Sequence, residues 1–423
     1  MIPVAEPPPA LQPNAPAATL PARCEVLVVG AGPAGCAAAI TLARVGVDVV
    51  LIDQHSFPRD KVCGDGLIPD AHAALRRLGV YDEVQALARP ASHVGCIAPR
   101  GGRIDVPGAL AVLPRRDLDW ILCRAAVAAG ARMHAPLKFV APLEAGDAVV
   151  GAVLQAGEQR VELRAQWLLL ATGAVPQALI AAGMSERQTP SGVALRGYIR
   201  NPAMAGQIDH LEVVWHRALR PGYGWIFPCR GGVFNVGVGL ADSHDAKRNG
   251  RLAKRQFNLK QVFDDFTRAY EPARRLVDGG EWVAPLKGAP LRCTLEGARY
   301  ARPGLLVTGE AAGSTYSFTG EGIGKALETG MLAADAVIAG RAQGQGEAQV
   351  RAAYEAALLA LKPRFDLYAR ANRVNGHPWL ADLLVWRAQR SPRLLARMSG
   401  VLNETSNPGH IVSAKGLVRL FAE

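Results

Sequence analysis

Apolar and polar positions fall into blocks over residues 25–53, EVLVVGAGPAGCAAAITLARVGVDVVLID, and these blocks predict strand, turn, helix and strand. Residues 26–29 are an apolar, β-branched run of strand length. A glycine-rich turn follows and opens a helix of small residues, which ends near Arg44. A second apolar run leads to Asp53, 23 residues after Gly30. A strand, glycine turn and helix followed by an acidic residue at this spacing are typical of a dinucleotide-binding unit.

Each glycine of this GxGxxG turn has its own expected role. Gly30 permits the tight turn, Gly32 lets the backbone approach a pyrophosphate, and Gly35 lets helix and strand pack closely. The phosphate then lies at the helix N-terminus, where unpaired N–H groups and the helix dipole stabilise negative charge. Asp53 is expected to accept hydrogen bonds from ribose hydroxyls. The predicted contacts of this unit are Gly30, Gly32, Pro33, Ala34, Gly35 and Asp53.

The pattern changes character further along the chain. Helical spacing follows Pro69 and Arg115, and an apolar strand then runs into Ala171-Thr172-Gly173. Alternating residues over 192–200 and 211–216 predict an antiparallel sheet. The chain returns to a strand at 305–308, and a second glycine-rich turn then opens a long helix over 326–339. Glycine-rich turns of this kind leave backbone N–H groups free to face a cofactor.

Composition limits the class of protein. With 423 residues, 49% of them hydrophobic, the chain can bury a sizeable core, and no apolar run approaches the roughly 20 residues of a membrane-spanning helix. Residues 1–22 contain seven prolines and no lysine or arginine, which predicts a disordered leader and no targeting peptide. The net charge of +11 comes mostly from scattered arginines, so we expect a solvated basic surface and no nucleic-acid partner.

The seven cysteines form no CxxC pair, which indicates a reducing cytoplasm and argues against a dithiol reductase. No spacing predicts a metal site. Cys63 is the one cysteine in a position suited to chemistry, in a loop rich in glycine and charge. It is either a small residue that fits a tight loop or a catalytic redox or proton-donating group.

Taken together and in order, these motifs resemble the FAD-dependent oxidoreductases of the p-hydroxybenzoate hydroxylase type. The resemblance implies that FAD is the dinucleotide and that Glu310, where aspartate is usual, contacts its ribityl chain. Arg115 matches the cofactor-side arginine of that superfamily. The further cofactor contacts that the resemblance implies are Gly64, Ala171, Gly173, Gly309, Gly320, Gly322, Ile323 and Gly324.

Two motifs narrow the resemblance to the geranylgeranyl reductase family. Residues 58–65, PRDKVCGD, are similar to the PxxxxCGG stretch of that family, with Asp65 in place of the second glycine. Residues 223–228, YGWIFP, followed by VGVG at 236–239, look like its YxWxFP and VGxG signature. Ser317 stands where that family usually has proline. By this resemblance Tyr223, Trp225 and Phe227 line the substrate cavity beside the flavin, although a buried aromatic cluster is the alternative.

The resemblance implies redox chemistry on an apolar isoprenoid or natural-product-like substrate, free or bound to a carrier. Reduction of a carbon–carbon double bond by hydride transfer from reduced flavin is the leading interpretation. Monooxygenation through a flavin peroxide is the alternative, weakened because Thr172 replaces the aspartate of the hydroxylase GADGxxS motif. Halogenation is a weaker alternative, because residues 62–137 contain no lysine. The electron donor is expected to be NAD(P)H, visiting without a second dinucleotide unit, or a separate reduced partner protein.

The predicted fold class is α/β, with a Rossmann-like FAD-binding domain, an inserted antiparallel substrate domain and a helical C-terminal tail. The FAD-binding domain is expected over 23–180 and 291–348, the substrate domain over 181–290 and the helical region over 349–423. Around residues 377–390, apolar positions followed by arginines predict either a helix packed on the core or an interfacial helix. A cytoplasmic protein with peripheral membrane contact is the corresponding hypothesis.

Overall fold

The strand, turn and helix predicted for residues 25–53 form the centre of the first of two sheets. The computed structural model describes residues 12–241, 247–248, 251–252 and 257–408. Strand β1 (Arg23–Val29) pairs in parallel with β2 (Val49–Ile52) on one side and with β9 (Gln159–Leu170) on the other. Its apolar run is buried because this sheet is covered on both faces, as parallel sheets generally are.

The first sheet extends outward from these central strands. Its order is β17 (Ala301–Arg302), β18 (Leu305–Val307), β9, β1, β2 and β6 (Arg132–His134). Two further strands, β7 (Lys138–Ala145) and β8 (Ala148–Ala156), continue antiparallel from β9. Apart from β17, the strands of the main path run parallel. This topology matches the predicted Rossmann-like half of the molecule.

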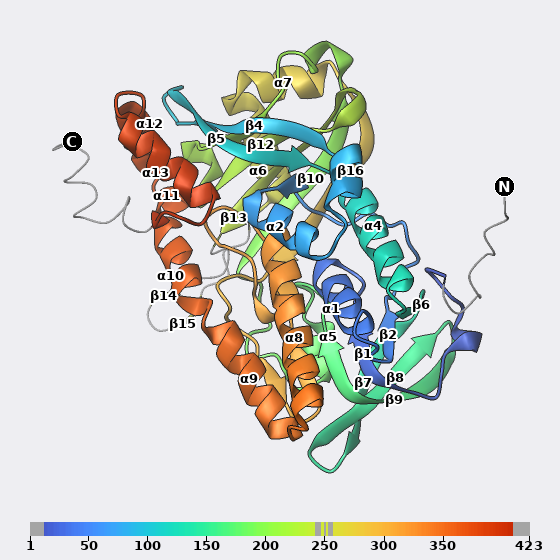
Figure 1. The fold of residues 1–423 in the computed structure, drawn as a ribbon. Coiled ribbons are helices and arrows are strands. Elements are labelled where there is room, and N and C mark those ends of the chain that lie inside the picture. Colours follow the sequence, from blue (N-terminus) through green and yellow to red (C-terminus); the bar gives the residue numbers. More distant parts are fainter. Residues whose placement is uncertain (1–11, 242–246, 249–250, 253–256, 409–423) are drawn as a thin grey trace.

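Helix α1 (Pro33–Ala43) packs tightly against α8 (Ile323–Gln343), the long helix predicted after the second glycine turn. Small side chains permit this approach, because six of the nine buried residues of α1 are alanine, glycine or cysteine. Figure 1 shows α1, α4 and α8 as neighbours beside the strands. The other helices of this half are α2 (Pro69–Arg77), α3 (Tyr81–Leu87), α4 (Arg115–Ala128) and α5 (Gln177–Ala181).

Gly330 of α8 marks the closest approach of the two helices. A Cβ at this position would lie 2.1 Å from the carbonyl oxygen of Ala34. We therefore expect Gly330→Ala to lower the free energy of unfolding by about 3 kcal/mol, measured by chemical denaturation. Gly376→Ala is the control, because nothing lies within 4 Å of a Cβ at that helical glycine. Equal stability of the two variants would contradict this packing.

The second sheet is larger than the predicted substrate domain. Its order is β16 (Glu281–Leu291), β10 (Gly192–Arg200), β13 (Val233–Ala241), β12 (Gly222–Pro228), β11 (Leu211–Val214), β4 (Arg89–Ile97), β5 (Arg103–Val112) and β3 (Gly66–Leu67). The last three strands come from residues 66–112, which the sequence analysis assigned to a continuous FAD-binding segment over 23–180. They join this sheet because β4 pairs with β11 in parallel, from Leu211 opposite Val94 onward. The chain therefore crosses between the two halves more often than predicted.

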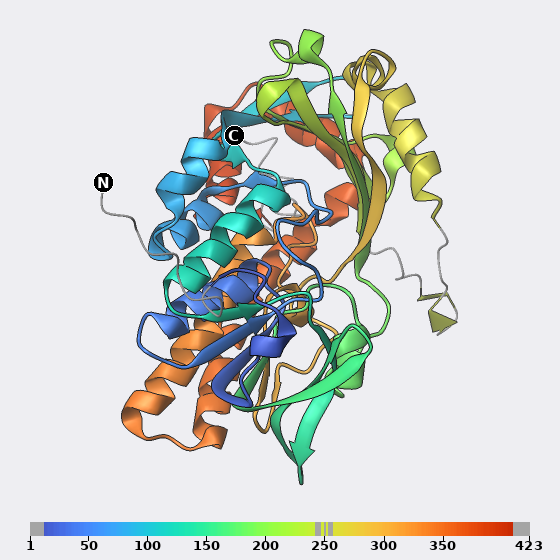
Figure 2. The ribbon, with the colours of Figure 1, turned by 90° about the vertical axis from the view of Figure 1, so that its right-hand side faces the viewer.

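Helices cover the second sheet. Helices α6 (Leu259–Ala269) and α7 (Glu271–Asp278) pack on it through Phe263, Phe266 and Leu276, and Figure 2 shows them along its outer side. The helices of the predicted C-terminal region are α9 (Glu347–Leu359), α10 (Lys362–Ala371), α11 (Arg373–Gly376), α12 (Trp379–Ala388) and α13 (Pro392–Leu402). Residues 409–423 of that region lie outside the described residues. The last three helices pack toward β4, β5 and β12.

The described part of the predicted leader, residues 12–22, has defined contacts with the first half. The Asn14 side chain exchanges two hydrogen bonds with the backbone of Phe57, and the Ala15 N–H donates to the carbonyl of Met133. The prediction of disorder is therefore wrong for this part, because proline-rich composition says nothing about such pairings across the chain. Residues 1–11 lie outside the described residues. Among the described helices, none is long and apolar enough to cross a bilayer.

Candidate active site

A cavity of about 630 Å³ lies where the two sheets and the C-terminal helices meet. The first half contributes the glycine turn after β1, including Gly32, and the start of α8, including Ile323. The second sheet contributes Trp225 and its neighbours, and the C-terminal helices contribute apolar side chains such as Leu384 and Met398. One end of the cavity is therefore polar and rich in glycine, and the other is aromatic and aliphatic.

The polar end contains a place suited to an anion. Gly32 is the N-cap of α1 and no side chain caps the helix, so its first N–H groups have no side-chain acceptor. A Cβ at Gly32 would lie 3.6 Å from Nη2 of Arg115 and 3.9 Å from Nη2 of Arg59. Two guanidinium groups and a helix N-terminus therefore converge on one open position.

Buried carboxylates hold these arginines in place. Arg115 forms a bidentate pair with Asp119, at 2.7 Å for both contacts, and Arg59 reaches the same carboxylate at 3.1 Å. Asp53 lies beside them, with Oδ2 accepting from the Ala31 N–H and 3.5 Å from Arg59. Asp53 and Arg115, both predicted cofactor contacts, line the cavity, and so does Arg59, which was not predicted from the sequence.

The second glycine turn lines the opposite wall of this polar end. Glu310 accepts from Oγ1 of Thr315 at 3.3 Å and lies in the cavity wall with Gly320, Gly322 and Ile323. Gly320 has φ of +70°, and a Cβ there would lie 2.7 Å from the Tyr223 hydroxyl. Tyr223 in turn donates to the carbonyl of Thr319 at 2.7 Å. The turn and the substrate-side strand are thus fastened to each other.

Three predicted cofactor residues, Gly35, Gly309 and Gly324, do not line the cavity. Each permits close packing beside it instead. A Cβ at Gly35 would lie 1.8 Å from the carbonyl oxygen of Gly30. A Cβ at Gly309 would lie 2.5 Å from the Cβ of Ala34, and one at Gly324 would lie 2.4 Å from the Asp70 carboxylate. Every other predicted site residue lies in the cavity wall: Gly30, Gly32, Pro33, Ala34, Asp53, Cys63, Gly64, Arg115, Ala171, Gly173, Tyr223, Trp225, Phe227, Glu310, Gly320, Gly322 and Ile323.

Strand β12 turns Tyr223, Trp225 and Phe227 toward the same cavity. Their successive ring centroids are 6.3 and 6.4 Å apart. Trp225 donates from Nε1 to Oδ1 of Asn235 at 2.8 Å, which satisfies its one polar atom and fixes the ring. Phe227 lies against the backbone of Gly64. The arrangement gives a planar apolar wall next to the loop that carries Cys63.

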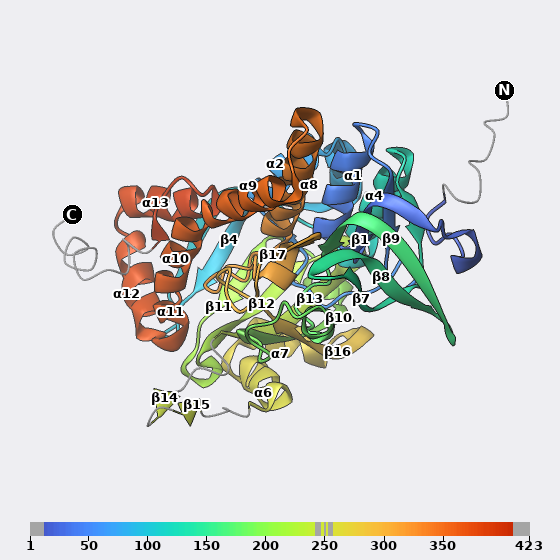
Figure 3. The same cartoon turned by 90° about the horizontal axis from the view of Figure 1, so that it is seen from below.

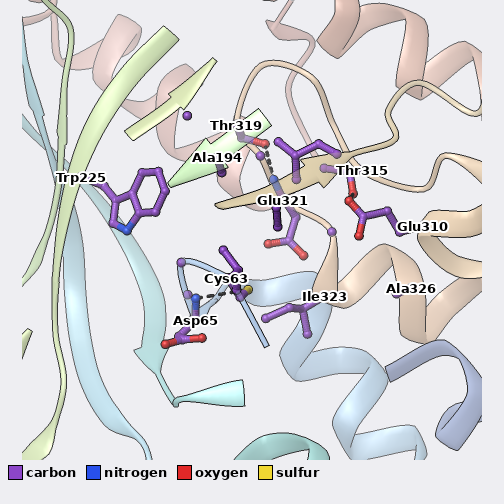
Figure 4. Close-up of a pocket in the computed structure, with 18 of the residues that line it drawn as sticks. Cys63, Asp65, Ala194, Trp225, Glu310, Thr315, Thr319, Glu321, Ile323 and Ala326 are labelled. Carbon is purple, nitrogen blue, oxygen red and sulfur yellow. Dashed lines mark hydrogen bonds between the residues drawn. The ribbon is translucent and has the colours of Figure 1, made fainter. Parts of the chain in front are cut away.

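The Cys63 loop is clamped to the second sheet. The Cys63 carbonyl accepts from Asn235 at 2.8 Å and from Nε of Arg196 at 3.2 Å. Burial, reinforced by the charge of Asp65, raises the pKa of the Cys63 thiol above its ordinary value. Sγ accepts from the Asp65 N–H at 3.3 Å, as Figure 4 shows. Cys63 therefore stays a protonated thiol at neutral pH, which suits a proton donor and not a thiolate nucleophile.

Asp65 completes this clamp. It is fully buried and has φ of +65°. One carboxylate oxygen accepts from the Tyr198 hydroxyl and from Asn235 Nδ2. The other accepts from the backbone N–H of Arg115 at 3.3 Å. The residue therefore joins the cofactor-side helix α4 to the strands of the substrate side.

Glu321, in the second glycine turn, is a functional candidate that the sequence analysis missed. Its Oε1 accepts from the Gly324 N–H at 2.7 Å. Burial and the nearby Asp70 carboxyl raise the pKa of Glu321 well above its ordinary value, which favours the protonated form. Figure 4 shows Glu321 and Cys63 in the middle of the cavity, with Trp225 on one side. An acidic residue between two glycines of a cofactor turn was the signal available in the sequence.

Comparisons with known proteins decide the family. The model described as FAD binding domain matches residues 23–257. A menaquinone reductase of Mycolicibacterium smegmatis is 36% identical over 332 residues, which cover 75% of this chain and 77% of that protein. The chain belongs to the geranylgeranyl reductase-like family of FAD-dependent oxidoreductases. It is accordingly a FAD-dependent reductase.

Two further comparisons agree with this family. A digeranylgeranylglycerophospholipid reductase of Methanosarcina mazei is 28% identical over 327 residues, covering 74% of this chain and 75% of that protein. The solved structure of a geranylgeranyl bacteriochlorophyll reductase-like protein from Thermoplasma acidophilum superposes with a TM-score of 0.70. Its identity is 22%, over 95% of this chain and 96% of that one, so this likeness concerns the fold.

The residues of the polar end fit the FAD of the family. The open position at Gly32 between two guanidinium groups suits a pyrophosphate, and Asp53 and Glu310 offer acceptors to sugar and ribityl hydroxyls. Thr172 supplies an independent sign, because its buried hydroxyl has no hydrogen-bond partner among the described residues and the residue lines the cavity. A buried polar atom without a partner is costly unless a ligand satisfies it.

Asp65 gives this site a pH-dependent stability. Burial, opposed by Arg196, raises the pKa of Asp65 from 3.8 to about 6. Between these values the folded protein holds a proton that the unfolded chain has lost, so rising pH destabilises the fold. As the pH rises from about 4 to about 6, we expect the free energy of unfolding of the wild type to fall by up to about 3 kcal/mol relative to that of Asp65→Asn. Denaturant titrations at both pH values measure the difference, and a difference that does not change with pH would contradict this assignment.

No metal site was predicted, and among the described residues one group of potential ligands lies on the second sheet. His93, Asp105 and His210 place one ligand atom each within 4.8 Å of one another. The guanidinium of Arg103 lies among them and bonds to both Asp105 and His210. Two members of the group already share this cation, so it is an ion-pair cluster and carries no argument for a metal.

Proposed function

We propose that the protein reduces a carbon–carbon double bond in the isoprenoid chain of an apolar lipid, with a prenylated quinone of the menaquinone type as the leading substrate. The observation that carries the proposal is the continuity of the cavity. Its polar end suits FAD, its other end is aromatic and aliphatic, and two acidic groups with raised pKa values, Cys63 and Glu321, lie where the two ends meet. The 36% identity to menaquinone reductases, against 28% for the phospholipid reductase, favours the quinone.

The chain's own residues bind and orient the two reactants. Gly32, Arg59 and Arg115 would hold the pyrophosphate of FAD, while Asp53 and Glu310 would bind its hydroxyls. FAD, when bound and reduced, supplies the hydride. The β12 aromatic wall, with Trp215 and Phe318, would hold an extended apolar chain and exclude water from it. Holding the chain in one orientation next to the cofactor is the main contribution of the protein to the rate.

Saturation of a double bond also needs a proton. Cys63 and Glu321 both line the cavity, and burial raises the pKa of each above its ordinary value, which favours the protonated form. We assign Cys63 as the donor. Its loop joins the polar end of the cavity to the aromatic wall, because the next residue, Gly64, lies against Phe227. Glu321 is the second candidate. Asp65 acts as a positioning residue that holds the Cys63 loop.

The electron donor is part of this proposal. The described residues include one strand, glycine turn and helix unit of the dinucleotide type, at β1 and α1. NAD(P)H would therefore deliver its electrons in transient contact, or a reduced partner protein would do so. Anaerobic reduction of the bound flavin by NADH and by NADPH separates these cases.

Product analysis tests the proposed function. The holoenzyme is incubated anaerobically with dithionite as reductant and a menaquinone, and the product is then reoxidised in air before mass spectrometry. Reduction of the chain leaves two extra hydrogens after reoxidation, whereas reduction of the ring alone is reversed. A product that returns to the starting mass would contradict the proposal, and a product that gains oxygen in aerobic turnover would favour the monooxygenase alternative.

A further inference from the structure

The outer side of α12 exposes two tryptophans. Trp379 is 55% and Trp386 is 46% exposed, and a spacing of seven residues places them on one side of the helix, with Leu383 between them. The opposite side of α12 is buried against β4 and β5 through Leu380, Leu384 and Val385. Figures 1 and 3 show α12 at the periphery of the molecule, away from the first sheet. We call Trp379, Leu383, Trp386 and Arg390 the α12 face.

Positive charge surrounds this face. Arg390 lies over the Trp386 ring, 5.0 Å from its centroid, and donates to the Trp386 carbonyl at 2.9 Å. The segment 379–402 contains four arginines, at 387, 390, 393 and 397, and a single acidic residue, Asp382. Asp382 already pairs with Arg100, whose backbone N–H donates to it at 2.9 Å and whose Nε lies 3.9 Å from it. The helices that carry the two indoles therefore have an excess of positive charge, which suits an anionic surface.

The same helices form the apolar wall of the cavity. Leu384 lines the cavity from the buried side of α12, and Met398 and Leu402 line it from α13. The exposed tryptophans and the substrate end of the cavity therefore lie on two sides of one helical layer.

We propose that the α12 face docks on the surface of an anionic lipid bilayer. Indole rings and arginines are the side chains best suited to the boundary between headgroups and acyl chains. A second copy of the chain fits this face less well, because a two-fold contact would bring its arginine rim against an identical one. The further step, that docking delivers the isoprenoid substrate, rests on the proposed function.

Co-sedimentation of the full-length holoenzyme with vesicles tests the docking. We expect binding to phosphatidylcholine vesicles that contain phosphatidylglycerol, weaker binding to pure phosphatidylcholine, and loss of binding at high salt. The double variant Trp379→Ala/Trp386→Ala and the variant Arg390→Ala/Arg393→Ala should each bind at least about tenfold more weakly. Arg160→Ala/Arg164→Ala, on exposed positions of β9, is the matched charge control and should bind as the wild type does.

Two results would overturn the docking proposal. One is wild-type protein that stays in the supernatant, and the other is unchanged binding of the tryptophan double variant. A wild-type dimer that this double variant dissociates, without vesicle binding, would assign the face to a second copy.

A separate assay keeps this proposal distinct from the proposed function. With substrate in detergent micelles, the tryptophan double variant should turn over as the wild type does, and with substrate in anionic vesicles it should be at least about tenfold slower. Vesicle binding without any chain reduction would contradict the proposed function alone. Turnover in micelles without vesicle binding would contradict the docking alone.

Discussion

Gly32→Asp should abolish stable FAD binding while the protein remains folded. The new carboxylate would extend into the open position between Arg59 and Arg115. It would pair with the two guanidinium groups that would otherwise bind the pyrophosphate. Like-charge contact with a phosphate costs several kcal/mol, so the dissociation constant for FAD should rise by about a thousandfold. Fluorescence titration of the apoprotein with FAD measures this change, and circular dichroism checks the fold.

Gly32→Ala is the matched control for this variant. Its methyl group meets no atom closer than 3.6 Å and the backbone of Gly32, with φ of −82°, is open to any residue, so the apoprotein should be as stable as the wild type. It should weaken FAD far less than the aspartate does, because it adds no charge. Gly32→Asp purified with a full complement of flavin would disprove the placement of the pyrophosphate.

Cys63→Ala should slow the reduction of the substrate double bond by about a hundredfold, with the rate of flavin reduction unchanged. The expected size follows from the general range of 10² to 10⁴ for proton transfer by a positioned group. The thiol lines the cavity in its protonated form, and its loop is held by Arg196, Asn235 and Asp65, so the loop should keep its place without the sulfur. Stopped-flow measurement of the two half-reactions separates these rates.

Glu321→Gln provides the comparison for Cys63→Ala. Glutamine keeps an acceptor for the Gly324 N–H but cannot supply an acidic proton. If Cys63 is the donor, Glu321→Gln should retain most of the oxidative half-reaction. The opposite pattern, with full activity in Cys63→Ala and a large loss in Glu321→Gln, would move the donor role to Glu321.

The first dinucleotide unit could be predicted because its signals are local. The apolar run of β1, the turn at Gly30 and the acid at Asp53 lie within one short stretch, and each has a direct physical reason. The second glycine turn and helix α8 are equally local. The aromatic wall was implied by the family resemblance, and the two-residue period of a strand explains why Tyr223 and Trp225 face the same side.

Other features depend on contacts that no local pattern records. Strands β4 and β5 join the second sheet through the parallel pairing of β4 with β11, more than a hundred residues later in the chain. The Asp65 clamp depends on Tyr198 and Asn235, which come from two further strands. In the sequence Asp65 was only a departure from glycine, and the structure shows what its carboxylate contacts.

The most direct test of the account is a single turnover with a substrate whose ring cannot accept electrons. Enzyme-bound flavin is reduced anaerobically and mixed with menaquinol, in which the headgroup is already reduced, or with its chain-saturated analogue. We predict that the unsaturated chain reoxidises the flavin, with one double bond lost per flavin, and that the saturated analogue leaves it reduced. Flavin that stays reduced with both compounds, or that reoxidises equally with both, would contradict hydride transfer to the isoprenoid chain.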